Sequence, residues 1–111
     1  MYSIQQASVL AQVTASTIRY YEKIALIPSI KRNEQHHRIF DDQDIELLNL
    51  IRCFRTLGMS IEDIKNNITM IHTTHETINT QAILIEHKKK LEEQIHMLEG
   101  YIHEIDQKIV S

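Results

Sequence analysis

The sequence has very few of the residues that carry covalent and metal chemistry. Its 111 residues include one cysteine, Cys53, one proline, two glycines and no tryptophan. A single cysteine excludes an intrachain disulfide and any metal site built from a cysteine cluster. The sequence also lacks a glycine-rich phosphate loop, a catalytic carboxylate pair and a cysteine–histidine arrangement. We therefore expect no enzyme, no cofactor and no bound metal.

Long apolar runs are missing as well. No stretch reaches the roughly 18 apolar residues that a membrane span needs. The first residues, MYSIQQASVLAQVTAS, lack the basic start of a signal peptide, and glutamines interrupt their apolar run. The length suits at most one domain. We expect a cytoplasmic protein.

Charge is unevenly distributed along the chain. The formal net charge is −3, yet residues 1–40 hold five basic side chains against two carboxylates. Residues 66–111 hold four lysines against seven carboxylates. This asymmetry indicates an anionic partner, such as DNA, for the front of the chain alone.

Helix-start signals divide the first two thirds of the chain. Side chains suited to N-caps precede each apolar pattern, and three of them form capping-box spacings. The N-cap candidates are Ser3, Thr14, Asp41 and Ser60. Helices are predicted over about 4–11, 15–24, 42–57 and 61–71, the third ending at Gly58. Residues 29–32 and 37–40 are predicted to pair as a small β-hairpin, or wing.

The last third carries a heptad pattern. Apolar residues recur at alternating spacings of three and four, with Lys88 at one polar position. The stripe consists of Leu84, Leu91, Ile95, Leu98, Ile102, Ile105 and Ile109. A helix over about 76–109 would be roughly 50 Å long, too long to bury this stripe on a domain of about 70 residues. We expect it to pair with a second copy in a two-fold dimer, the alternative being a helix folded back on its own domain.

The first two predicted helices have the spacing of a helix-turn-helix, which lays its second helix across the DNA major groove. Four side chains of that second helix share one face at helical spacing. They are Ser16, Arg19, Tyr20 and Lys23. Arg19 can reach a guanine edge or a phosphate, and the Tyr20 hydroxyl can donate to a phosphate oxygen. The alternative is an ordinary solvated face with the tyrosines in the core.

Wing charges strengthen the DNA-binding interpretation. Lys31, Arg32 and Arg38 give a second basic surface beside the first. The chain resembles the MerR family of bacterial transcription regulators in three ordered segments, TIRYYEKIALIP, HHRIF and IRCFRTLGMSIEDIK. The match covers about residues 2–71, and the heptad tail fits too.

This resemblance implies a mainly α fold. A winged helix-turn-helix with a β-hairpin wing and a second, helical wing occupies residues 1–71. Residues 72–111 form a linker and a long dimerisation helix that pairs as an antiparallel coiled coil. Recognition-helix contacts fall on Thr17, Arg19 and Tyr20, hairpin-wing phosphate contacts on His37 and Arg38, and the second-wing contact on Arg55.

The resemblance also implies a mechanism. Family members bind, as homodimers, a promoter whose spacer is too long, and they bend and untwist it so that RNA polymerase meets both promoter elements. This chain would be an activator with weak repression when uninduced. The chain departs from the family pattern at three places. Gln12 and Ala25 each stand where a glycine is usual, and the segment Gln35-His36-His37 stands where a glycine and a tyrosine are usual.

Cys53 is the candidate sensor. One subgroup similar to this chain keeps a lone cysteine at this place and responds to aldehydes or other electrophiles. A nearby arginine favours the reactive thiolate, whereas the alternative is an inert, buried small hydrophobe. For the whole protein two other classes stay open: an architectural or recombination accessory winged-helix protein without a sensor role, and a coiled-coil adaptor with no DNA role.

Overall fold

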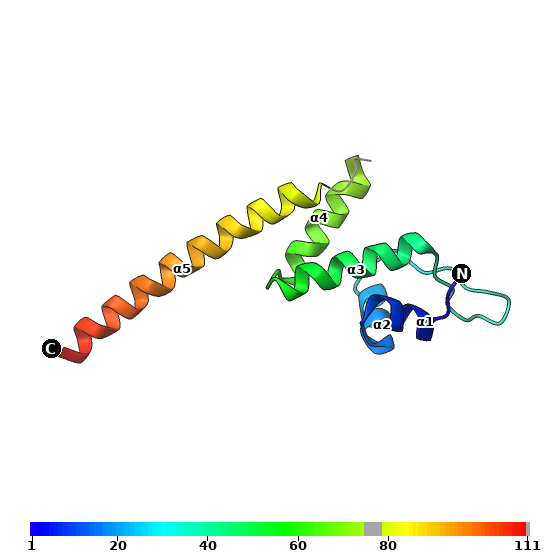
Figure 1. The fold of residues 1–111 in the computed structure, drawn as a ribbon, viewed down its shortest axis with the longest axis horizontal. Helices are drawn as coiled ribbons and strands as arrows, with labels where there is room; N and C mark the ends of the chain where they lie inside the picture. The colour runs from blue at the N-terminus through cyan, green and yellow to red at the C-terminus, as the bar shows by residue number, and fades with distance from the viewer. Residues whose placement is uncertain (75–78, 111) are drawn as a thin grey trace. The chain divides into compact units, whose positions relative to one another are not determined.

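The computed structural model describes residues 1–74 and 79–110, with the side chains of residues 1–69 and 79–110. The chain divides into two compact units, Met1–Glu76 and Thr77–Ser111. The helices are α1 (Ile4–Ala11), α2 (Ala15–Lys23), α3 (Asp42–Thr56), α4 (Ile61–Thr74) and α5 (Thr80–Val110) (Figure 1). The linker predicted from residue 72 and the predicted helix start at residue 76 fall partly on residues 75–78, outside the described residues. Within the described ranges, no helix combines the length and apolarity that crossing a bilayer requires.

The caps confirm the predicted helix starts. The Ser3 hydroxyl accepts the Gln6 backbone N–H at 3.1 Å, while the Gln6 side chain accepts the Ser3 N–H at 2.8 Å. Asp41 and Asp44 form the same reciprocal pair at 2.8 and 3.0 Å. Such pairs satisfy backbone donors that a helix start leaves without partners. The hydroxyls of Thr14 and Ser60 each accept one backbone N–H, from Thr17 and Asp63.

Left-handed backbone occurs at the positions where the sequence departs from the glycines of the family pattern. The φ angles of Gln12, Ala25 and His36 are 56°, 60° and 64°. Glycine adopts this conformation without steric cost, whereas a Cβ atom makes it unfavourable. The turns therefore keep their conformation although their glycines are absent. Gly58, with a φ of 83°, ends α3 as predicted.

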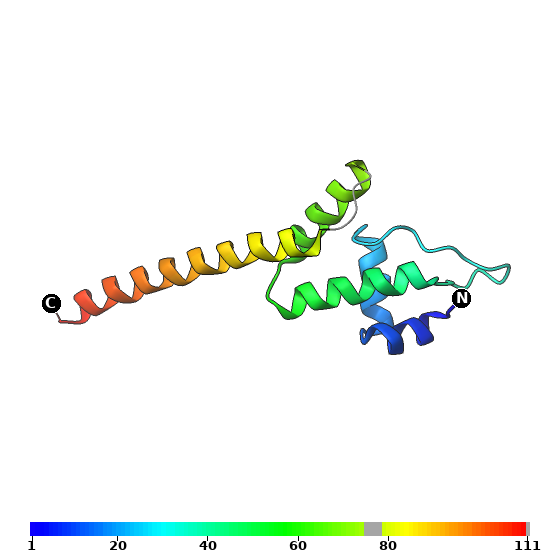
Figure 2. The same cartoon turned by 45° about the horizontal axis from the view of Figure 1, so that its top comes forward.

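The core of the first unit lies where three helices meet. α1 packs on α2 and α3, and α3 also packs on α4 (Figure 2). Ala7 and Ala11 of α1 are fully buried, and their small side chains allow close approach of the helix backbones. The largest fully buried side chains are Ile18, Leu26, Phe40, Leu48, Ile51, Phe54 and Ile64.

The predicted β-hairpin is not seen, because residues 29–40 form a loop without strands. One isolated antiparallel bridge, between Arg32 and Arg38, lies within the loop, and a second joins Phe40 to Tyr2. We call residues 29–40 the wing loop. Two backbone hydrogen bonds cross it, from the Ile39 N–H to the Lys31 oxygen at 2.8 Å and from the Asn33 N–H to the His37 oxygen at 2.9 Å. Asn33 Oδ1 accepts the N–H groups of residues 35 and 37, both at 3.0 Å, as an Asx-type turn. Phe40 bonds Tyr2 through both backbone groups at 2.8 Å, so the end of the loop pairs with the start of the chain.

Candidate nucleic-acid interface

Helix α2 has one buried and one exposed face. Ile18 is fully buried and Tyr21 is 6% exposed, whereas Tyr20 is 50% exposed. The alternative that places both tyrosines in the core therefore holds for Tyr21 and fails for Tyr20. The other members of the predicted face, Ser16, Arg19 and Lys23, are also exposed. Burial of the opposite face fixes α2 and leaves this one open to a partner.

Thr17 takes part in the start of α2. Its backbone N–H donates to Thr14 Oγ1 at 3.1 Å, and its hydroxyl lies 2.7 Å from the same oxygen. The side chain is half-buried. Thr17 thus lies at the edge of the exposed face and stabilises the cap of the helix.

A hollow of about 290 Å³ lies between the start of α1, helix α2 and the wing loop. Three guanidinium groups and two imidazoles line it, together with the positive N-terminal end of α1. Among the described residues that line the hollow there is no carboxylate. The lining residues are Ser3, Ile4, Gln5, Arg19, Arg32, His36, His37 and Arg38. This chemistry suits an anionic group such as a phosphodiester.

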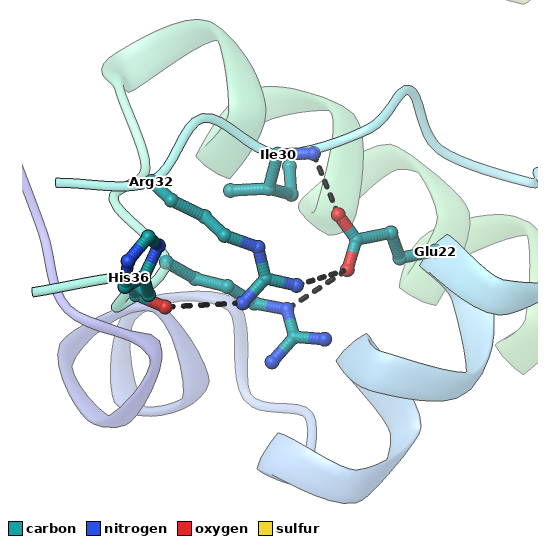
Figure 3. A network of polar contacts seen from close by, with 5 residues as sticks. Glu22, Ile30, Arg32 and His36 are labelled. Atoms are coloured by element: carbon teal, nitrogen blue, oxygen red, sulfur yellow. Dashed lines mark hydrogen bonds and ion pairs between the residues drawn. The ribbon is translucent and has the colours of Figure 1, made fainter.

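Glu22 connects α2 to the wing loop (Figure 3). Its Oε2 accepts the Ile30 backbone N–H at 2.7 Å, and its Oε1 accepts Arg38 Nε at 2.8 Å. Arg32 Nη2 lies 3.9 Å from Oε1, and Arg32 Nη1 donates to the His36 carbonyl oxygen at 3.2 Å. The side chains of Glu22 and Arg38 are only 14% and 21% exposed. Two of the predicted wing cations are therefore held by one carboxylate.

The charge of Glu22 is stabilised by these partners. Partial burial alone raises the pKa of its carboxyl group, but the Ile30 N–H and the two arginines outweigh that effect. The net result is a pKa below the ordinary value for glutamate. Hydrogen bonds and opposite charges both favour the ionised form. Glu22 is consequently a carboxylate at neutral pH.

Several predicted contact residues lie outside the hollow. Ser16, Lys23 and Lys31 are exposed but do not line it. Arg55, on α3, is exposed and donates from Nη1 to the Met59 carbonyl oxygen at 2.7 Å. This bond fixes the guanidinium beside the turn after α3.

Sequence reasoning missed five residues of this region. Four of them line the hollow, namely Ser3, Ile4, Gln5 and His36, and Glu22 orders it. A sequence signal existed for Glu22 alone, because it lies three residues after Arg19 on the same helix. The other four line the hollow only because the fold brings the start of α1 and the wing loop together.

The remaining candidates lie on α3 and α5. Cys53 is exposed on α3, so the alternative of a buried side chain is contradicted. Along α5, six members of the heptad stripe are more than a third exposed in this single chain. They are Leu91, Ile95, Leu98, Ile102, Ile105 and Ile109. Leu84 is half-buried.

A short helix, a tight turn and an exposed cationic helix, flanked by a basic loop, define a helix-turn-helix DNA-binding module. The description "MerR HTH family regulatory protein" matches residues 2–71, and "MerR, DNA binding" matches residues 45–109. The chain belongs to the MerR family of DNA-binding transcription regulators.

Three similar proteins illustrate the relationship. An uncharacterized HTH-type transcriptional regulator from Haemophilus influenzae is 31% identical over 97% of this chain and 81% of its own length. The HTH-type transcriptional regulator AdhR from Bacillus subtilis is 33% identical over 80% of this chain, which spans 64% of that relative. HiNmlR, a MerR family regulator lacking the sensor domain, has a crystal structure bound to promoter DNA. Its structural alignment with this chain has a TM-score of 0.68 and 32% sequence identity, and it covers 91% of this chain and 77% of that one.

Proposed function

We propose that this protein acts in the cytoplasm as a homodimer that binds promoter DNA and distorts it to control transcription. The observation that carries the proposal is the basic hollow between α1, α2 and the wing loop, beside the exposed face of α2. Helix α2 would read base edges in the major groove, and the hollow would take a backbone phosphate beside it.

Arg19 is the residue that tests this arrangement most sharply. It belongs both to the exposed face of α2 and to the lining of the hollow. Arg19→Ala should weaken binding to a selected operator about tenfold or more, as expected for loss of one good base or phosphate contact. Lys89→Ala, on the exposed surface of α5, is the matched loss of charge and should leave affinity unchanged. Equal affinities of wild type and Arg19→Ala would contradict the proposal.

The dimer is supported by the exposed apolar stripe of α5. An isolated helix gains nothing from such a stripe in water, whereas a second copy of the same helix buries it. Two copies would present two α2 helices to one duplex. A two-fold arrangement predicts a palindromic operator.

Promoter distortion separates a regulator from an architectural protein. A regulator of this family acts on the spacing between two promoter elements, so transcription in the presence of the protein should depend steeply on spacer length. Deleting two base pairs from the spacer should make the promoter constitutive, so that transcription no longer requires the protein. An architectural DNA-bending protein would give the same effect at every spacer length.

The aldehyde or electrophile response is proposed for Cys53. Its exposure on α3 supports access by a small electrophile, and Arg52 and Arg55 lie close in sequence. The thiol would add across an aldehyde carbonyl, forming a carbon–sulfur bond while the oxygen takes the proton. Cys53→Ala should abolish induction of a reporter by methylglyoxal or formaldehyde while leaving operator binding intact. Unchanged induction would reject the sensor role.

A further inference from the structure

We propose that Glu22 is a positioning residue that fixes the wing loop against α2 and so sets how strongly the protein discriminates its operator from other DNA. The inference rests on the proposed DNA-binding function. Glu22 is negatively charged, although it lies beside a basic hollow whose chemistry suits an anion. We therefore look for a role of Glu22 in DNA binding in addition to its contribution to stability.

Glu22 holds the wing loop at both of its sides. Oε2 accepts the N–H of Ile30, near the start of the loop, at 2.7 Å. Oε1 accepts Nε of Arg38, near its end, at 2.8 Å. Figure 3 shows the carboxylate lying between the loop and the helix, with Arg32 directed toward it. A single side chain of α2 therefore contacts both sides of the loop.

These contacts matter because the wing loop lacks a ladder. In a paired hairpin, backbone hydrogen bonds set where each side chain projects. Here two backbone bonds cross the loop, from the Ile39 N–H to the Lys31 oxygen at 2.8 Å and from the Asn33 N–H to the His37 oxygen at 2.9 Å. Both lie within the loop, whereas the Glu22 contacts join the loop to α2. Without Glu22, Arg38 loses its hydrogen-bond acceptor and Arg32 its ion-pair partner, and the long side chain of Arg38 in particular regains rotamer freedom. The position of a phosphate relative to α2 would then be less sharply defined.

Charge gives the second part of the effect. Arg32, Arg38 and Glu22 together carry a net charge of +1 when all three are ionised, and the lowered pKa of Glu22 keeps it ionised. Two unrestrained arginines would carry +2 and attract phosphates of any sequence. Glu22 thus reduces attraction to non-specific DNA and orients the guanidinium groups that the operator meets. Both effects raise the ratio of specific to non-specific affinity.

Glu22→Gln tests the proposal, with Glu34→Gln as the matched control. Glu34 lies exposed on the same loop, so its substitution makes the same change of charge without touching the network. The probes are the duplex that wild type enriches from a random-sequence pool and a scrambled duplex of equal length. Dissociation constants and their salt dependence are measured on both duplexes for each protein.

Glu22→Gln should lower the ratio of specific to non-specific affinity at least tenfold. It should also steepen the salt dependence on scrambled DNA by about one unit, as for one added phosphate contact. Glu34→Gln should keep the ratio within twofold of wild type. A folded Glu22→Gln protein whose ratio equals that of Glu34→Gln would overturn the proposal. Failure of wild type to enrich any sequence would instead defeat the proposed function, and this inference with it.

Glu22→Asp is a second test variant, which is needed if circular dichroism shows that Glu22→Gln does not fold. Aspartate keeps the charge, but its carboxylate is one methylene too short to hold Ile30 and Arg38 together. The ratio should fall here as well, and charge cannot account for the fall. An unchanged ratio in the folded Glu22→Asp protein would overturn the proposal.

Discussion

Lys65 of α4 donates from Nζ to the carbonyl oxygen of Ile24, just past the end of α2, at 2.8 Å. The last carbonyl groups of a helix carry partial negative charge and lack partners within the helix. Lys65 supplies a hydrogen-bond donor for one of these carbonyl groups. The contact joins α4 to the end of α2 through two residues that are 41 positions apart in sequence.

Lys65→Ala should therefore reduce the free energy of unfolding by about 0.5–1 kcal/mol, the usual range for a cation at an exposed helix end. Chemical denaturation monitored by circular dichroism measures this change. Asn66→Ala, at the neighbouring exposed position, is the control and should change stability less. An equal effect of both substitutions would show that the Lys65 contact contributes nothing of its own.

The left-handed turn at Ala25 gives a prediction of opposite sign. Its φ of 60° is costly for a residue with a Cβ atom, by about 1–2 kcal/mol. Ala25→Gly removes that cost but adds chain entropy to the unfolded state, about 0.5–1 kcal/mol. The net expectation is a gain of up to about 1 kcal/mol, seen as a higher melting temperature.

Gly58→Ala is the companion change. The glycine has a φ of 83°, and a Cβ there meets no atom within 4 Å, so only backbone strain opposes the substitution. The strain of about 1–2 kcal/mol is partly offset by about 0.5–1 kcal/mol from the lower chain entropy of the unfolded variant, so the net loss of stability should be up to about 1 kcal/mol. If Ala25→Gly lowered the melting temperature while Gly58→Ala left it unchanged, the strain argument would fail.

The lowered pKa of Glu22 predicts a pH dependence. A carboxyl group whose pKa is depressed on folding stabilises the fold above its unfolded pKa, about 4.3, and this stabilisation is lost as the pH falls through the folded value. Wild type should be more stable than Glu22→Gln at pH 7. The difference should shrink as the solution is acidified below about pH 4.3. A difference that stayed constant down to the folded pKa would mean that the charge of Glu22 is not what stabilises the loop.

The stripe of α5 predicts the effect of a buried charge on assembly. Ile102→Lys would place two ammonium groups in the seam of a two-fold dimer, and should weaken dimerisation about a hundredfold or more. Gln107→Lys adds the same charge away from the stripe and should leave the dimer intact. Sedimentation velocity at micromolar concentration distinguishes the two. Dimers of equal strength in both variants would place the interface elsewhere.

The helices were largely predictable because their signals are local. Ser3, Thr14, Asp41 and Ser60 each cap the helix that they were expected to cap. A cap depends on atoms three residues away, which the sequence displays directly. The heptad stripe on α5 is visible for the same reason.

The wing loop was not predictable, because its structure depends on distant partners. Residues 29–32 and 37–40 have strand-like composition, yet Phe40 pairs with Tyr2 and Ile30 with Glu22. The composition cannot display these partners. The same limit hid His36 and Ser3 from the predicted site, since the hollow joins the start of α1 to a loop more than thirty residues away.

Arg38 illustrates a partial success. Its place in a basic surface was expected, and it lines the hollow. Its bond to Glu22 was not expected, because pairing across 16 residues requires the turn that Ala25 and the loop provide. Identifying a charged residue from sequence is easier than identifying its partner.

The stoichiometry of the DNA complex tests the central claim most directly. Sedimentation equilibrium of the wild-type protein with its selected duplex gives the number of chains bound, and hydroxyl-radical footprinting of the same complex gives the protected backbone. Two chains per duplex, with two symmetric protected segments, are predicted for paired α2 helices joined through α5. One chain per duplex, or a single protected segment, would contradict the account.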